Sequence, residues 1–274
     1  MELEIRELKP TIGSEIIATK QDLLSGEYGG QLRDLLEQRG VLVFPEINFS
    51  DDEQVAFTKT LGQFAPEMLD GGGESVHRIS LDKSQSASAD YLRGSMYWHL
   101  DGTMNEVPIL ASILSAKVLT PTGGDTEFCN TYAAYAALPE SEQEEYDHLK
   151  VMHSAWNTLF YYEPETGFDM LDQMMAIGEN ELPLVWKHRS GRKSLVLGCT
   201  AYQIVDFEHK ESIRLLVKLR DWATRPEYVY RHKWSVGDTV IWDNTGTMHR
   251  ALPYDPGSGR LMHRTKLEGE EAFA

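Results

Sequence analysis

The stretch Tyr97-Trp98-His99-Leu100-Asp101-Gly102-Thr103 places an imidazole and a carboxylate two positions apart. Because side chains alternate along an extended strand, His99 and Asp101 are predicted to point to the same side of it. This pair would form half of a metal site, and a histidine from elsewhere in the chain would complete it. His249, which follows a strand-like run ending at Asn244, is the best candidate. Two histidines and one carboxylate on one face of an ion are typical of non-haem Fe(II) centres.

A His-x-Asp pair is weak evidence by itself, because a chain with 9 histidines and 43 acidic residues contains such pairs by chance. The alternative is an ordinary surface turn. Two further residues favour a site. Arg260 opens an apolar strand, where a guanidinium is awkward without an anionic partner and where its planar fork suits a carboxylate. Thr126 follows the turn at Gly123-Gly124 and could donate a hydrogen bond to the same carboxylate.

The composition limits the classes of protein that fit. The chain has 274 residues, 41% of them hydrophobic, and residues 1–274 are predicted to form one domain because no repeat or linker is evident. A formal net charge of -17 argues against nucleic-acid and anionic-membrane partners. Two cysteines are too few for a disulfide framework, and neither a signal peptide nor an apolar run of about 18 residues is present. We therefore predict a soluble, cytoplasmic protein.

Many short strands with a few helices predict a mainly β fold with helical insertions, arranged as a double-stranded β-helix, or jelly roll. Such a core can bring distant residues to one open end. The segment 156–175 is predicted to be an irregular aromatic insertion, and the segments 71–73 and 84–90 to be loops. The main predicted strands are 41–45, 109–114, 126–129, 239–243 and 261–267, and the main predicted helices are 32–39, 51–61 and 208–223.

Together these pieces resemble the TauD/TfdA family of Fe(II)- and 2-oxoglutarate-dependent dioxygenases. The resemblance covers essentially the full length, in the family's order and spacing. The matching pieces are Ile12-Gly13-x-Glu15-Ile16, Trp98-His99-x-Asp101, Gly123-Gly124-Asp125-Thr126, Tyr228 to Asn244, His249 and Arg260-Leu261-Met262-His263-Arg264.

The resemblance implies a role for each site residue. It implies that His99, Asp101 and His249 are the catalytic iron ligands, and that Thr126 and Arg260 contact the distal carboxylate of 2-oxoglutarate. The keto-acid end of this co-substrate would reach the iron and leave one position for O2. The reaction would release succinate and CO2 while a small organic molecule is hydroxylated. Asp101 stands where iron halogenases have Gly or Ala, which favours hydroxylation.

The substrate is the least determined part of the prediction. By resemblance, Arg264 is the candidate anchor for a substrate carboxylate or sulfonate, and the alternative is a structural ion pair. Relatives that act on small sulfonates carry a His-x-His after the helix that ends here at Gly62, whereas this chain has none and places Glu67 near the second histidine. That departure argues against taurine. Aromatic and apolar residues could instead line a larger pocket, and the candidates are Phe64, Met68, Phe160, Tyr161 and Tyr162.

Two other classes of protein stay open. A jelly-roll metal hydrolase or isomerase could use the same triad with Zn(II), but it would leave Thr126 and Arg260 without a task. A non-catalytic 2-oxoglutarate-binding sensor could keep the pocket without turnover. Related enzymes are often dimers or tetramers, so a homo-oligomer is also open. Outside the triad, His77, His148, His209 and His232 are predicted to be surface groups, and His263 is predicted to face away from the pocket.

Overall fold

The structure is a computed structural model that describes residues 3–66, 73–84, 86 and 89–274. Of the pieces discussed above, Glu67 and Met68 lie outside the described residues, and so do parts of the two predicted loops near residues 71 and 85. No helix within the described part of the chain is both long and apolar enough to span a membrane.

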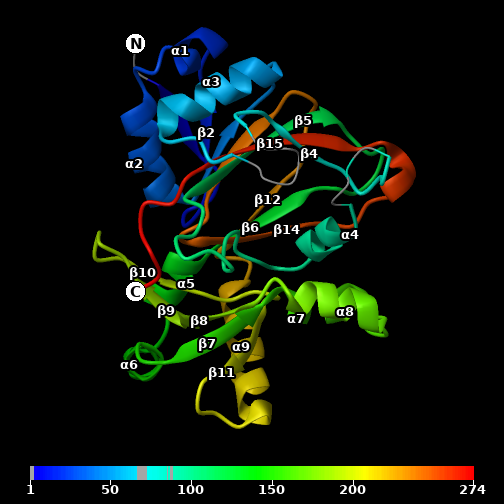
Figure 1. The fold of residues 1–274 in the computed structure, drawn as a ribbon. Helices are drawn as coiled ribbons and strands as arrows, with labels where there is room; N and C mark the ends of the chain where they lie inside the picture. Colours follow the sequence, from blue (N-terminus) through cyan, green and yellow to red (C-terminus); the bar gives the residue numbers. More distant parts are fainter. Residues whose placement is uncertain (1–2, 67–72, 85, 87–88) are drawn as a thin grey trace.

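A large sheet forms one wall of the molecule (Figure 1). Its seven described strands lie in the order β1-β2-β3-β13-β5-β15-β4, and neighbouring strands are antiparallel except for the parallel pair β2 and β3. The strands are β1 (Glu4–Glu7), β2 (Ser14–Ile17), β3 (Val41–Phe44), β4 (His77–Ile79), β5 (Ala111–Val118), β13 (Thr239–Asp243) and β15 (Leu261–Leu267).

A small sheet faces the large one and carries half of the predicted site. It has the order β12-β6-β14, with β12 (Val229–His232), β6 (Thr126–Asn130) and β14 (Thr247–Ala251) all antiparallel. An isolated antiparallel bridge between His99 and His249 extends this sheet by one short segment. Residues far apart in the sequence therefore lie side by side at its edge.

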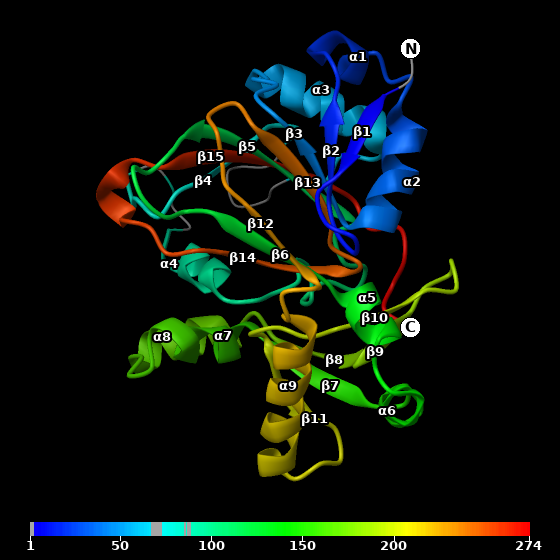
Figure 2. The ribbon, with the colours of Figure 1, turned by 180° about the vertical axis from the view of Figure 1, so that it is seen from behind.

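Helices cover the outer face of the large sheet (Figures 1 and 2). They are α1 (Lys20–Leu24), α2 (Gly29–Arg39) and α3 (Asp51–Leu61). The α3 helix begins with the predicted capping box, in which the Ser50 and Glu53 side chains each accept a hydrogen bond from the other residue's backbone N–H. Apolar residues of α2 and α3 such as Leu36 and Phe57 share one buried cluster with Phe44 and Ile113 of the sheet.

The two sheets enclose a second apolar cluster. Phe128 of β6 packs against Trp242 of β13, with ring centroids 5.5 Å apart, and Val43, Val240 and Met262 of the large sheet join them. Because alternate residues of a strand face opposite sides, the central strands β3, β5 and β13 each supply one set of residues to the helices and one to this inner layer. This inner apolar layer lies beneath the predicted site.

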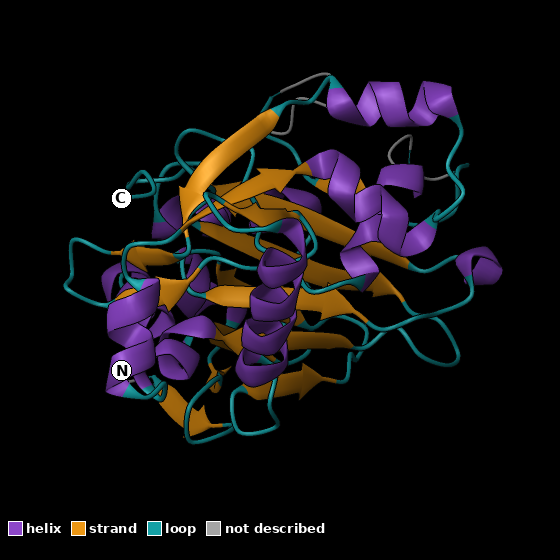
Figure 3. Cartoon of the chain, turned by 90° about the horizontal axis from the view of Figure 1, so that it is seen from below, coloured by secondary structure: helices purple, strands orange, loops and turns teal. Residues whose placement is uncertain are grey.

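The outer face of the small sheet packs against the remaining elements, and Figure 3 shows helices around and in front of the central strands. Cys129 and Met248 belong to a third buried cluster together with residues of α5 and α9. The elements on this side are α5 (Thr131–Ala136), α6 (Glu140–Tyr146), β7 (Lys150–Ser154), α7 (Ala155–Tyr162), α8 (Phe168–Met175), β8 (Glu179–Pro183), β9 (Val185–Lys187), β10 (Lys193–Leu195), β11 (Ala201–Ile204) and α9 (His209–Ala223). Shorter helices are α4 (Ala89–Leu92), η2 (Arg93–Met96) and η3 (Pro256–Ser258).

The main strands and helices predicted from periodicity are confirmed with small shifts at their ends, but other expectations are wrong. The segment 156–175 is mostly helical, in α7 and α8, and not irregular. Phe160 on α7 is 41% exposed, whereas Tyr161 beside it lines a cavity together with Tyr97 and Trp98. His77 and His232 are buried instead of lying on the surface. Polar context misled the prediction for His232, whose ring is enclosed because Asp238 and Tyr230 satisfy its two nitrogens.

Candidate active site

His99 and His249 are brought together by main-chain pairing. The N–H of His99 donates to the carbonyl of His249 at 3.1 Å, and the N–H of His249 donates back at 2.9 Å. This exchange places the two imidazole rings on the same face, with centroids 4.1 Å apart. The pairing explains how two histidines from distant parts of the sequence reach one point.

Asp101 reaches the same point by a different local structure from the one expected. His99 lies in an isolated bridge and Asp101 begins a turn, so the predicted continuous strand is wrong. Gly102 permits the turn, because its φ is 90° and a Cβ there would lie 2.8 Å from the backbone nitrogen of Ile109. The turn redirects the chain while the Asp101 side chain still converges with His99.

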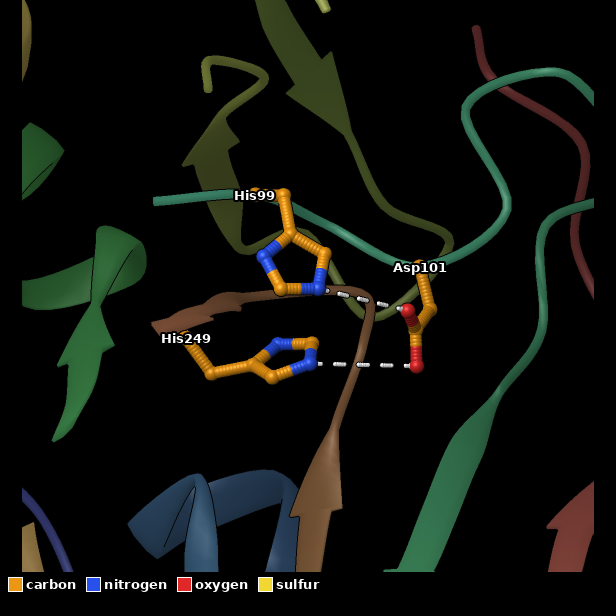
Figure 4. Close-up of side chains that lie close together, drawn as sticks. All are labelled: His99, Asp101 and His249. Carbon is orange, nitrogen blue, oxygen red and sulfur yellow. Dashed lines mark ion pairs between the residues drawn. The ribbon is translucent and has the colours of Figure 1, made fainter. Parts of the chain in front are cut away.

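The three side chains form the cluster drawn in Figure 4, and their ligand atoms all lie within 4.8 Å of one another. His99 Nε2 is 3.7 Å from Asp101 Oδ1, and His249 Nε2 is 3.9 Å from Asp101 Oδ2. Within the part of the chain that the structure describes, this is the one group of three or more such residues close enough to share a metal ion.

The protonation states suit metal ligation. Burial and the nearby His99 lower the pKa of His249 to about 3, so its imidazole is neutral at physiological pH. Burial would raise the pKa of Asp101, but His249, Arg264 and His99 together hold it well below its usual range. His99 Nδ1 donates to the carbonyl of Tyr97 at 2.8 Å, so Nε2 is the ring nitrogen that faces Asp101.

Arg260 is buried close to the Gly123-Gly124 turn. Its side chain is 3% exposed and Nη2 donates to the carbonyl of Gly124 at 3.2 Å, while Nε has no hydrogen-bond partner among the described atoms. No carboxylate of the described residues forms an ion pair with it; the nearby Asp125 pairs with Arg231, and the guanidinium lies over the Tyr254 ring, 4.6 Å from its centroid. A Cβ at residue 124 would lie 3.1 Å from Arg260 Nε, so glycine is needed for this close approach. A buried guanidinium without a carboxylate partner favours an anionic ligand.

Thr126 is the first residue of β6, two positions after Gly124, and it is 4% exposed. Its hydroxyl accepts a hydrogen bond from the indole N–H of Trp234 at 3.0 Å. Since an indole N–H can only donate, the hydroxyl hydrogen of Thr126 remains able to donate to an acceptor. Thr126 and Arg260 thus bring two donors to the same turn.

Arg264 lies on β15, with Nη1 3.9 Å from Asp101 Oδ2. His263 beside it faces the opposite way and contacts Asp51 at the start of α3, as the alternation of the strand predicts. The distance from Arg264 to Asp101 is that of an ion pair without a hydrogen bond. Arg264 is therefore next to the triad.

Two residues near the triad were not singled out from the sequence. Ser112 of β5 donates to Asp101 Oδ2 at 2.9 Å, and Asn244, which follows β13, donates to Ser112 Oγ at 3.0 Å. Ser112 is 0% and Asn244 1% exposed. A serine inside an apolar strand run was the available signal, because a buried hydroxyl needs a partner.

The class follows from these observations. Two imidazoles and one ionised carboxylate, gathered at one point beside the buried Arg260 and Thr126, match the ligand set that is typical of non-haem iron oxygenases. The donor chemistry fits Fe(II), since imidazole nitrogen and carboxylate oxygen are both accepted by this ion.

Comparisons with known proteins give the family. Residues 4–266 match the family described as Taurine catabolism dioxygenase TauD, TfdA family. The chain is 35% identical to the alpha-ketoglutarate-dependent 2,4-dichlorophenoxyacetate dioxygenase of Cupriavidus pinatubonensis, with 92% of each protein covered. It is 31% identical to the (S)-phenoxypropionate/alpha-ketoglutarate-dioxygenase of Sphingobium herbicidovorans, over 98% of this chain and 96% of that protein. The solved structure of AAD-2 in complex with Mn(II) and N-oxalylglycine matches with a TM-score of 0.84, 30% identity and full coverage of both chains.

The chain therefore belongs to the TauD/TfdA family. It is an alpha-ketoglutarate-dependent dioxygenase, an oxidoreductase that uses Fe(II) and 2-oxoglutarate and acts on a small organic molecule.

Proposed function

We propose that this dioxygenase oxidises small organic anions and that aryloxy carboxylates are its main substrate class. The observation that carries the proposal is the placement of Arg264 within 3.9 Å of the Asp101 carboxylate, which puts a cation beside the predicted metal position. The relatives named for 2,4-dichlorophenoxyacetate and (S)-phenoxypropionate support a carboxylate. A relative from Pseudomonas putida named as a sulfate ester dioxygenase is 30% identical over 98% of this chain, so sulfate esters are the second candidate class.

We assign the metal ligands to His99, Asp101 and His249, and the distal carboxylate of 2-oxoglutarate to Arg260 and Thr126. The buried Arg260, which no acid of the described residues neutralises, supports the second assignment. A zinc hydrolase or isomerase would leave this cation without a counterion, which argues against that alternative.

Each residue has a defined task in this proposal. Fe(II), 2-oxoglutarate and O2, when bound, supply a two-electron oxidation that inserts one oxygen atom into a substrate C–H bond and the other into succinate, with release of CO2. His99, the neutral His249 and the ionised Asp101 would hold the ion and leave the rest of its coordination sphere to the co-substrate and O2. Arg264 fixes the substrate anion and so determines which carbon lies nearest the metal. Hydroxylation of the carbon next to an ether oxygen would give a hemiacetal, which collapses to a phenol and a carbonyl compound.

We also propose that the two facing sheets are a double-stranded β-helix core and that residues 1–274 form one domain. The antiparallel pairing of both sheets and the family match over residues 4–266 support this. A cytoplasmic location is a proposal too, supported by Cys129 and Cys199, which are both buried free thiols. Assembly into a dimer or tetramer stays a prediction that light scattering can test.

The test starts with an anaerobic titration of the apo-protein with Fe(II) and then 2-oxoglutarate, followed by the visible charge-transfer absorption of a keto acid chelated to iron. Succinate release is then measured in air with 2,4-dichlorophenoxyacetate, (S)-2-phenoxypropionate, an alkyl sulfate and taurine. Stoichiometric succinate and phenol from the aryloxy acids would support the proposal. Turnover of the alkyl sulfate alone would replace the substrate class, and the absence of succinate with every compound would favour the sensor.

A further inference from the structure

We infer that Ser112 and Asn244 are positioning residues, and that the chain Asn244–Ser112–Asp101 restricts Asp101 to one metal-binding oxygen. The inference rests on the metal site proposed above and goes beyond the ligands themselves. It concerns which oxygen of the Asp101 carboxylate is available to the metal and which contacts hold the other oxygen in place.

The direction of this hydrogen-bond chain is fixed by chemistry. An ionised carboxylate can only accept, so the 2.9 Å contact uses the single hydroxyl hydrogen of Ser112. Ser112 Oγ must then accept at its 3.0 Å contact with Asn244, whose amide nitrogen has only hydrogens to give. If the amide were turned over, its oxygen would compete with Asp101 for that same hydrogen. The orientation with the Asn244 nitrogen toward Ser112 is therefore the one that satisfies both contacts.

The backbone around this hydrogen-bond chain is held in place by strand pairing. Ser112 lies within β5, where it pairs with Trp242 of β13 on one side and Lys266 of β15 on the other. The N–H of Asn244 donates to the carbonyl of Leu110 at 2.9 Å, which ties the residue to the start of the same strand. Since both side chains are almost completely buried, water does not compete for their hydrogen bonds.

The two carboxylate oxygens of Asp101 have different surroundings. Oδ2 accepts from Ser112 and lies 3.9 Å from both Arg264 Nη1 and His249 Nε2, whereas Oδ1 lies 3.7 Å from His99 Nε2 and does not accept from Ser112. Holding Oδ2 in this way leaves Oδ1 as the ligand oxygen. A carboxylate that could swing freely would offer both oxygens to the ion and occupy a position that 2-oxoglutarate or O2 needs.

β5 offers a matched control for the test. Ser115 is also buried on β5, and its hydroxyl also shares a hydrogen bond, at 2.8 Å with Thr239, but its partner lies in β13 and not in the triad. Ser112→Ala and Ser115→Ala remove the same atom from the same strand. They differ in whether that atom touches a predicted metal ligand.

The experiment measures the Fe(II) dissociation constant of each apo-protein under anaerobic conditions, the absorption band with 2-oxoglutarate, and the thermal unfolding of the metal-free proteins. We expect Ser112→Ala to weaken Fe(II) binding by about 10- to 100-fold and to shift the band, because outer partners of metal ligands have effects of this size. Asn244→Ala should act in the same direction but less strongly. The double variant should match Ser112→Ala, because Asn244 acts through Ser112. Ser115→Ala should leave affinity and band unchanged.

Three outcomes would overturn the inference. The first is that Ser112→Ala keeps the Fe(II) affinity and the absorption band of the parent protein, and the second is that Ser112→Ala and Ser115→Ala lose Fe(II) affinity equally. The third is that the losses of Fe(II) affinity in the two single variants add up in the double variant. If Ser112→Ala does not fold, Asn244→Ala carries the same comparison. Failure of the parent protein to bind Fe(II) would instead contradict the proposed function, so the two failures are distinguishable.

Discussion

Asp101 and Asp243 are two aspartates withdrawn from solvent in the same molecule, and their pKa values move in opposite directions. Burial raises the pKa of Asp243 to about 6, because only Thr245 donates to it and its Oδ2 has no hydrogen-bond partner among the described atoms. The pKa of Asp101 is held below its usual range despite burial, because His249, Arg264 and His99 face it. Burial alone therefore does not mark a functional carboxylate.

The difference lies in what surrounds each side chain. Asp243 ends β13 and is enclosed by a structural turn, where the protein gains a local hydrogen bond and tolerates a proton on the carboxyl group. Asp101 stands where cationic and metal-binding side chains converge, so its charged form is favoured. Convergence of opposite charges from several elements is the signal of a site.

The largest expected effect tests this contrast directly. Asp101→Asn should weaken Fe(II) binding by more than about 100-fold, which exceeds the usual effect of an outer partner, because a charged ligand is lost. Asp243→Asn should keep the parental affinity, since no metal ligand contacts that side chain. Anaerobic Fe(II) titration of both variants checks the prediction, and equal losses in the two would remove the distinction.

The second-largest effect is expected at Arg260, which no carboxylate of the described residues neutralises. Arg260→Gln should raise the KM for 2-oxoglutarate by about 10- to 100-fold with kcat largely retained at saturation, because hydrogen bonds to a charged group contribute roughly 1.5–3 kcal/mol. Arg250→Gln is the matched control, since Arg250 pairs with Glu127 and lies one residue after His249. An unchanged KM in Arg260→Gln would show that this arginine does not bind the co-substrate.

A smaller effect is expected at Arg264. Arg264→Gln should raise the KM for an aryloxy carboxylate by about 10-fold, which corresponds to one charge-assisted contact, while 2-oxoglutarate affinity stays near the parental value. Steady-state succinate release at varied substrate and fixed 2-oxoglutarate separates the two constants. If the substrate KM does not move, Arg264 is a structural residue.

The smallest effect is on stability and concerns Asp243. Its folded-state pKa of about 6 lies above the ordinary value of 3.8, so between these values the folded protein holds a proton that the unfolded chain has released. The free energy of unfolding should therefore fall as pH rises through this window. Relative to Asp243→Asn, the parent should lose about 2 kcal/mol between about pH 4 and about pH 7. Denaturant unfolding of the metal-free proteins at both pH values measures the difference, and a constant difference would contradict the raised pKa.

Much of the fold was predictable because its signals are local. The strand 261–267 and the capped α3 helix follow from alternation and from the Ser50 and Glu53 spacing, and both are confirmed. The segment 156–175 was not predictable in the same way, because aromatic residues are compatible with helix, strand and loop. The strand assumed through His99 and Asp101 was wrong for a related reason, since tertiary pairing and not local alternation sets the two side chains there.

The sequence by itself determined the chemical identities at the site. It placed two histidines, one carboxylate and one arginine at the boundaries of apolar strands, and these residue types limit the chemistry whatever their exact placement. Only the tertiary structure decided how they meet. The paired backbones of His99 and His249, the cation of Arg264 beside Asp101, and the buried contact from Asn244 through Ser112 all join segments that are distant in the sequence. Such contacts depend on how the strands pair and pack, and residue spacing does not encode that pairing in a form that a single sequence reveals.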